Sequence, residues 1–78
     1  MNFSSYNPAH FNFSLNACTY TNASGEVVNG FTVQLTLGSF GHPMFSARNR
    51  DRVAKFATAD AARRDVQRRL PGLIEVAR

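Results

Sequence analysis

Alternation of apolar and polar residues in the first half of the chain is the feature that most constrains the fold. In residues 11–19 the side chains at every second position, starting with Phe11, are mostly apolar, and most of the side chains between them are polar. The pattern returns in residues 26–37, where the apolar positions are Phe31, Val33, Leu35 and Leu37. Successive side chains of a strand point to opposite faces of a sheet, so this period of two predicts two half-buried antiparallel strands.

The segments around these strands carry turn-forming residues. Residues 21–25 predict a turn, because Asn and Gly tolerate positive φ. An Asn-Gly pair at 29–30 predicts a bulge or an early turn inside the second strand. Residues 38–43, with two glycines and a proline, predict a loop. A third strand is expected over residues 44–56, with Asn49-Arg50-Asp51 bending it or splitting it in two.

After Phe56 the apolar spacing changes from two to three and four. This spacing predicts a helix with one apolar stripe, formed by Ala59, Ala62, Val66 and Leu70. Thr58 is suited to cap the helix, since its hydroxyl can accept from a free backbone amide. The Pro-Gly pair at 71–72 is expected to end the helix near Arg69 or Leu70.

These elements predict one small α+β domain over residues 1–78, an antiparallel sheet of three to four strands with one main α-helix packed on its apolar face. Residues 73–77 form either a short closing strand or a further helical turn, and periodicity does not decide between them. A chain of 78 residues buries only about 60–65% of the surface that its unfolded form exposes. A deep catalytic cleft is therefore hard to build, and a binding module is favoured.

Residue types that carry catalysis or bind metals are sparse. Cys18 is the single cysteine, so no internal disulfide can form, and a reducing cytoplasm is expected. Cys18, His10 and His42 do not lie at metal-ligand spacing, nothing identifies a base for Cys18, and no glycine-rich phosphate loop precedes the helix. No segment approaches the roughly 18–20 apolar residues of a membrane span. We therefore expect no enzyme, no catalytic residue, no metal, no cofactor and no membrane contact.

Charge is strongly segregated along the chain. Residues 1–47 contain no Lys or Arg and one acid, Glu26, whereas residues 48–78 contain nine basic and four acidic residues. Lysine and arginine displace counterions from phosphates, which makes a nucleic-acid-binding sheet-and-helix module one hypothesis. Its candidate residues on the third strand and the helix are Arg48, Arg50, Arg52, Lys55, Arg63, Arg64 and Arg68. Alternation would place the first three on one side of a regular strand, but aromatic residues are not interleaved with them as base stacking requires.

The polar face of the first strand supports the hypothesis that the sequence favours, a protein-binding surface, with nucleic-acid binding as the alternative. Tyr20 is in phase with Asn12, Ser14 and Asn16, so we expect the sheet to present its ring and hydroxyl to solvent. Tyrosine is enriched in interface hot spots because it supplies a large contact area at low entropic cost. Tyr6 precedes Pro8 in an irregular segment.

Several short motifs accompany these two tyrosines. In the N-terminal third they are Met1, Phe3, Tyr6, Ala9-His10, Asn12, Asn16-Ala17 and Tyr20. Further on they are Val27-Val28-Asn29-Gly30, Ala47-Arg48, Phe56 before Thr58, and Leu70-Pro71-Gly72. This layout resembles small phage anti-CRISPR proteins of the type I-F kind, which bind the backbone of the bacterial surveillance complex.

The resemblance implies a sheet backed by helix and a function as an inhibitor. Such a protein would bind the repeated backbone subunits of a type I surveillance complex and prevent target DNA from pairing with the guide RNA. The family's contact tyrosines fall on Tyr6 and Tyr20. Its acidic contact has no clear match, because the nearby position here is Phe31, and Glu26 is the candidate substitute. The resemblance also implies a phage- or mobile-element-encoded protein in the cytoplasm of a bacterial host. We expect a monomer or weak homodimer, with the basic helix able to rest on the complex's RNA.

Overall fold

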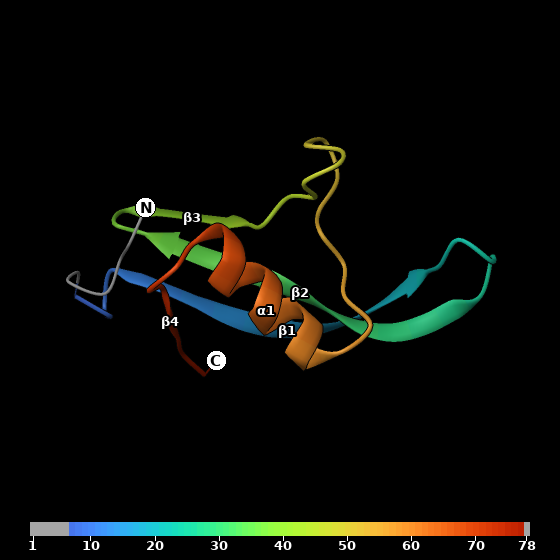
Figure 1. Cartoon of the computed structure of the whole chain (residues 1–78), viewed down its shortest axis with the longest axis horizontal. Coiled ribbons are helices and arrows are strands. Elements are labelled where there is room, and N and C mark those ends of the chain that lie inside the picture. The colour runs from blue at the N-terminus through green and yellow to red at the C-terminus, as the bar shows by residue number, and fades with distance from the viewer. Residues whose placement is uncertain (1–6, 78) are drawn as a thin grey trace.

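The computed structural model describes residues 7–77, and Tyr6 lies outside them. The elements in chain order are β1 (Phe11–Thr21), β2 (Val27–Leu37), β3 (Phe40–Pro43), α1 (Ala59–Arg69) and β4 (Ile74–Glu75). The four strands form one sheet in the order β3-β2-β1-β4, and α1 lies across it (Figure 1). The predicted α+β fold is therefore confirmed.

The sheet is mixed, which corrects the expectation of a purely antiparallel one. β1 pairs antiparallel with β2, and β2 with β3, whereas β4 pairs parallel with β1. β4 is parallel to β1 because α1 runs back along the sheet, so that the chain enters β4 in the same direction as β1 (Figure 1). Residues 73–77 thus supply a short strand rather than a further helical turn.

The β1–β2 hairpin has the turn that the sequence predicts. The side-chain oxygen of Asn22 accepts hydrogen bonds from the backbone N–H of Ser24 at 2.9 Å and of Glu26 at 3.0 Å. Gly25 has a φ of 83°, a conformation that favours glycine. This turn sets the register in which Phe13 lies opposite Leu35.

The predicted regular strand over residues 44–56 is wrong. β3 occupies Phe40–Pro43, where a loop was expected, because Gly38 at a φ of 69° permits a tight turn directly after β2. The chain follows β2 as far as Met44, whose N–H donates to Val33 at 2.8 Å, and joins it again at Phe56, which exchanges two hydrogen bonds with Phe31. Between these points the chain leaves the sheet, and we call residues 45–53 the arginine loop. The expectation that the middle of this segment splits the strand fits this path.

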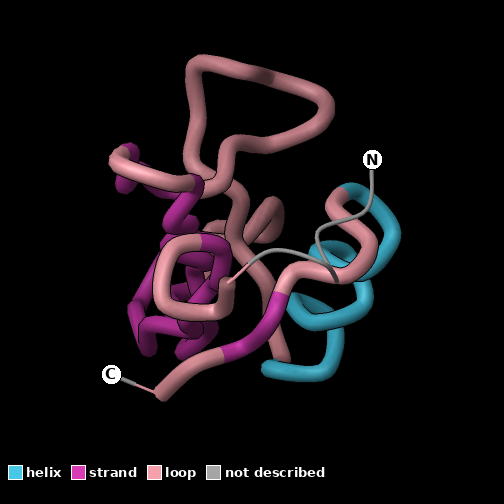
Figure 2. Tube along the Cα trace, turned by 90° about the vertical axis from the view of Figure 1, so that its left-hand side faces the viewer, coloured by secondary structure: helices cyan, strands magenta, loops and turns pink. Residues whose placement is uncertain are grey.

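The helix forms the second layer of the fold (Figure 2). The Thr58 hydroxyl accepts from the Ala61 N–H at 3.1 Å, as predicted for the cap, and α1 ends at Arg69. Ala62 and Val66 are fully buried against the sheet, whose core residues include Phe13 and Val33. Burial of a large apolar side chain such as Phe13, Val33 or Val66 stabilises the fold by about 1.5–3 kcal/mol.

Candidate nucleic-acid interface

The arginine loop projects from the sheet (Figures 1 and 2). Its sequence contains three arginines. Its base is a short antiparallel ladder in which Ala54 N–H donates to Met44 at 2.9 Å and Ser46 N–H donates to Arg52 at 2.7 Å. The tip is held by local bonds, including one from Asp51 N–H to the side chain of Asn49 at 3.0 Å. The prediction that the three arginines share one side of a regular strand is therefore wrong. Arg48, Arg50 and Arg52 are exposed on a hairpin that leaves the sheet.

Arg69 fastens the helix to the base of this loop. Its guanidinium donates to the Asp65 carboxylate at 3.0 Å and to the backbone carbonyl of Phe45 at 2.8 Å. The spacing of four residues between Asp65 and Arg69 is a sequence signal for their ion pair. The contact with Phe45 spans 24 positions and has no such signal, so sequence reasoning did not identify Arg69 as part of the site.

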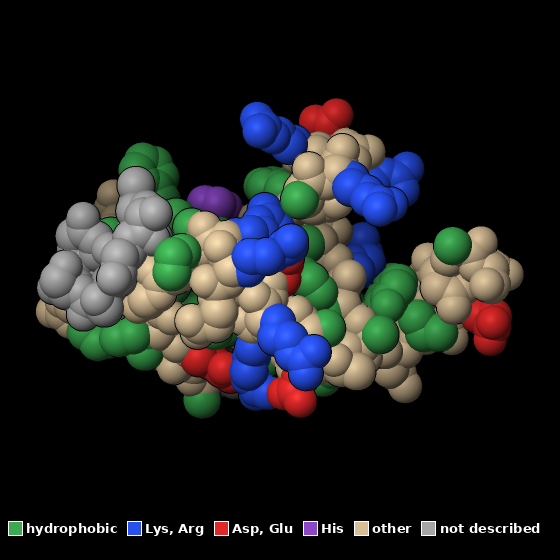
Figure 3. Space-filling view, in the orientation of Figure 1, with side chains coloured by type: hydrophobic (Ala, Val, Ile, Leu, Met, Phe, Trp, Pro, Cys, Tyr) green, Lys and Arg blue, Asp and Glu red, His purple; other side chains and the backbone are tan. Residues whose placement is uncertain are grey.

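Carboxylates neutralise the arginines of α1 more than those of the arginine loop. Arg63 pairs with Asp60 at 3.2 Å and with Glu75 at 2.7 Å, and Arg68 pairs with Asp65. Within residues 7–77, five of the cations named from sequence form no ion pair: Arg48, Arg50, Arg52, Lys55 and Arg64. The uncompensated positive charge therefore lies on the loop, on the segment that follows it and on one position of α1. Figure 3 shows Lys and Arg side chains over the loop and over the helix on one face.

The Asp65 carboxylate binds both Arg68 and Arg69, and its side chain is only 15% exposed. Partial burial raises its pKa, but the hydrogen bonds and the charges of Arg68 and Arg69 outweigh burial, so the pKa lies below its ordinary value. The carboxylate thus stays ionised and holds both guanidinium groups. Among the other groups, the hydrogen bond and charge of Glu75 raise the pKa of Arg63.

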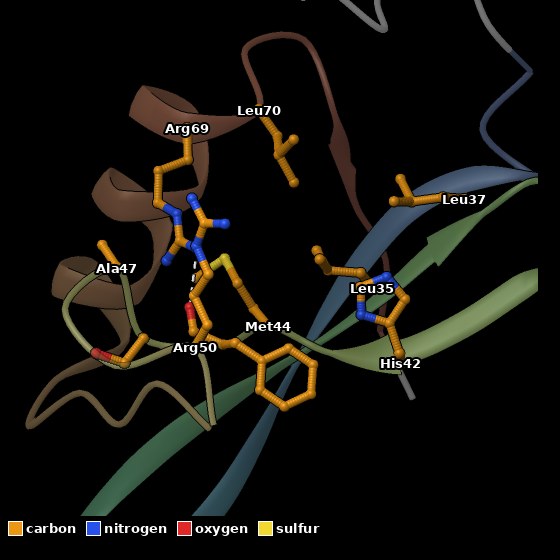
Figure 4. A pocket seen from close by; sticks show the side chains of 10 residues that line it. Leu35, Leu37, His42, Met44, Ala47, Arg50, Arg69 and Leu70 are labelled. Atoms are coloured by element: carbon orange, nitrogen blue, oxygen red, sulfur yellow. Dashed lines mark hydrogen bonds between the residues drawn. The ribbon is translucent and has the colours of Figure 1, made fainter. Parts of the chain in front are cut away.

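Two hollows flank the arginine loop. One, of about 510 Å³, lies between the loop, the sheet and the end of α1, and we call it the apolar hollow. Its apolar lining includes Leu35, Met44 and Leu70, and Arg50 and Arg69 also line it (Figure 4). The other, of about 350 Å³, is the basic hollow, to which four cations contribute: Arg48, Arg52, Lys55 and Arg69. Arg69 lines both hollows.

Aromatic rings lie among these cations, although they are not interleaved with them in the sequence. Phe45 lines the apolar hollow together with Arg50 and Arg69. Phe56 lines the basic hollow and also an adjoining depression with Arg64. The fold therefore produces a mixture of rings and positive charge that the order of residues in the sequence does not show, because the loop returns Phe56 to the sheet beside the helix.

The residues expected on a protein-binding face differ in how far they are exposed to solvent. Asn16 and Glu26 are exposed. Asn12 and Ser14 are only 6% and 1% exposed, so the expectation that they lie on an open polar surface is wrong. The Asn12 amide donates to the Pro8 carbonyl at 2.7 Å. Alternation assigns a residue to a face of the sheet but does not say whether that face is covered.

Tyr20 is half-buried rather than fully presented to solvent. Its ring lies against Gly30, on the neighbouring strand, at the place where a larger residue would carry its side chain. Part of the ring therefore packs on the sheet and part stays accessible. The other predicted contact tyrosine, Tyr6, is not among the described residues.

Residues 7–77 contain neither a metal-ligand cluster nor a membrane-spanning helix. No group of three or more His, Cys, Asp or Glu side chains lies close enough together to hold a metal ion. No helix in that range has the length and apolarity to cross a bilayer. Cys18 is a free thiol and half-buried.

Comparison with known proteins adds no relative to this description. No protein-family model, no curated protein and no solved structure matches the chain. The likeness to anti-CRISPR proteins therefore stays a prediction from short motifs. The function has to be argued from the geometry of the arginine loop, the helix and the two hollows.

Proposed function

We propose that this protein binds nucleic acid through a basic face. The face comprises the arginine loop, the segment up to Phe56 and the side of α1 that carries Arg64. The observation that carries the proposal is the gathering of five cations without ion pairs in the described chain beside two aromatic rings. The basic hollow and the depression beside Arg64 share Phe56 and Asp65, so the cations lie along one continuous surface.

The physical basis is phosphate neutralisation. Each cation that contacts a phosphate releases condensed counterions, so the affinity falls steeply as salt rises. The paired residues Arg63 and Arg68 contribute less, because their charge is already balanced by neighbouring carboxylates. The proposed role is binding without catalysis, to nucleic acid in the cytoplasm.

A binding titration with matched arginine variants tests this function. Fluorescence anisotropy would follow a labelled DNA between about 50 and 200 mM salt, where several phosphate contacts cost orders of magnitude in affinity. We expect the wild type to bind with steep salt dependence, and Arg50→Gln to bind more weakly with a shallower slope. Arg63→Gln is the control, because it changes the same type of side chain at a position where the charge is already paired. Absence of wild-type binding, or equal effects of the two variants, would contradict the proposal.

The far end of the β1–β2 hairpin supports a second candidate, the anti-CRISPR inhibitor suggested by the resemblance. This end extends beyond the helix (Figure 1), and it exposes Glu26 and Val27, the latter at 74%. Asn16 is exposed in the middle of β1. The partly accessible ring of Tyr20 lies on one face of this end and Val27 lies on the other. An accessible tyrosine suits a protein partner, here the backbone subunits of a type I surveillance complex. Salt-tolerant binding to that complex, weakened by Tyr20→Ala and not by Thr19→Ala, would support it. Loss of binding at raised salt would instead indicate contact with the complex's RNA.

A further inference from the structure

We propose that the apolar hollow receives one unpaired base of a single-stranded nucleic acid, while the neighbouring arginines hold its phosphates. This inference rests on the proposed function and adds to it the form of nucleic acid that is bound. The apolar hollow and the arginines belong to one surface, since Arg50 and Arg69 line the hollow and Arg69 also lines the basic hollow.

The hollow has the size and lining of a small-molecule site. Its volume of about 510 Å³ lies within the range of about 300–1,000 Å³ typical of such sites. Its apolar lining comes from Leu35 on β2, from Met44, which follows β3, and from Leu70 at the end of α1 (Figure 4). A flat, largely apolar ring can therefore be removed from water here.

One wall is aromatic and held in position. The rings of His42 and Phe45 are 6.3 Å apart between centroids and inclined by only 17°. Phe45 forms a backbone bridge with Val53, and its carbonyl accepts from Arg69, so the backbone that carries the ring is held in place, and 37% of the residue is exposed. Stacking on such a ring tolerates any base, because every base has a π-face.

Charge complementarity selects this occupant over an apolar peptide side chain. Arg50 has no ion pair within the described residues, and Arg69 shares its carboxylate partner with Arg68. The guanidinium of Arg50, without such a pair and beside an apolar lining, matches a ligand that joins a flat ring to a phosphate, whereas Asp65 already balances the charge of Arg69. In a duplex the bases are already stacked and paired, so a duplex can reach the arginines but cannot fill the hollow.

Three DNA probes test the inference by fluorescence anisotropy: a single strand, the same strand with abasic sites, and the duplex. The variant is Phe45→Ala, and the control is Phe40→Ala, which removes a ring that is 73% exposed on β3 and does not line the hollow. We expect Phe45→Ala to weaken single-strand binding by about tenfold, within the range for loss of one stacked base. Binding of the abasic strand and of the duplex should stay within about twofold of the wild type, and Phe40→Ala should change none of the three. Circular dichroism would verify that both variants are folded.

The outcomes separate this inference from the proposed function. If the wild type binds all three DNAs and Phe45→Ala weakens them equally or not at all, the base site is overturned while nucleic-acid binding stands. Equal wild-type affinity for the intact and the abasic strand would also overturn the base site. If the wild type binds none of the DNAs, both proposals fail.

Discussion

At the scale of single residues, Gly30 is required for a reason that the local sequence does not predict. The Asn-Gly pair at 29–30 predicts a bulge or an early turn, yet β2 runs unbroken through it. A Cβ on Gly30 would lie 2.5 Å from the Phe56 carbonyl oxygen and would overlap the Tyr20 ring. Glycine is therefore needed for space, and both neighbours that require the space are distant in sequence.

Gly30→Ala is accordingly expected to destabilise the protein by about 1–3 kcal/mol, the usual cost of inserting atoms into a packed region. The Phe56 carbonyl must shift, which strains its hydrogen bond from Phe31. Urea unfolding followed by circular dichroism would measure the change. Gly41→Ala is the control, because a Cβ there would meet nothing closer than 3.6 Å. Equal stability of the two variants would show that Gly30 is not tightly packed.

At the scale of elements, the period of the apolar residues predicts well those elements that depend on local pattern. β1, β2 and α1 with its Thr58 cap follow from spacings within one segment. The arginine loop and β4 do not, because the bonds that define them join residues far apart, such as Val76 N–H to the Phe13 carbonyl. The position of Arg69 depends in the same way on a partner outside its own helix.

Asp65 links the helix to the loop, and its contribution to stability should depend on pH. Its pKa in the folded protein is below the ordinary 3.8, so its ion pairs stabilise the fold above that pH. As the pH falls from about 4 through the folded-state pKa, the unfolded state binds the proton first and this contribution is lost. We expect Asp65→Asn to cost about 1–2 kcal/mol near neutral pH, because the lost hydrogen bonds involve a charged group, and much less at an acid pH below the folded-state pKa.

Urea titrations of wild type and Asp65→Asn at the two pH values measure that difference. Asp51→Asn is the matched control, because Asp51 is exposed and forms no ion pair with any described residue. Its effect should be small at both pH values. A cost for Asp65→Asn that does not change with pH would show that packing, and not the ionised carboxylate, is responsible.

At the scale of the whole molecule, the structure separates a stabilising core from a candidate binding surface. The buried cluster joins α1 to the sheet and includes Met44 and Ala54, the two residues that flank the arginine loop. The residues between them are mostly exposed and polar. Composition alone predicts a basic C-terminal half, but only the closure of the loop at its base shows that the charge stands apart from the core.

Replacement of residues 47–51 by Asn-Gly should therefore weaken DNA binding without loss of the fold. Ser46 and Arg52 are already joined by a 2.7 Å hydrogen bond, and Asn-Gly forms the two-residue turn that such a pair needs. We expect the free energy of unfolding to stay within about 0.5 kcal/mol, and the salt slope of DNA binding to fall by about 0.7–0.9 for each phosphate that Arg48 and Arg50 no longer neutralise. A full-length variant with Arg48→Gln and Arg50→Gln separates charge from loop length and should show the same slope. If the shortened protein is much less stable, the loop contributes to the core. If it binds DNA as before, the phosphates are bound by residues outside the loop.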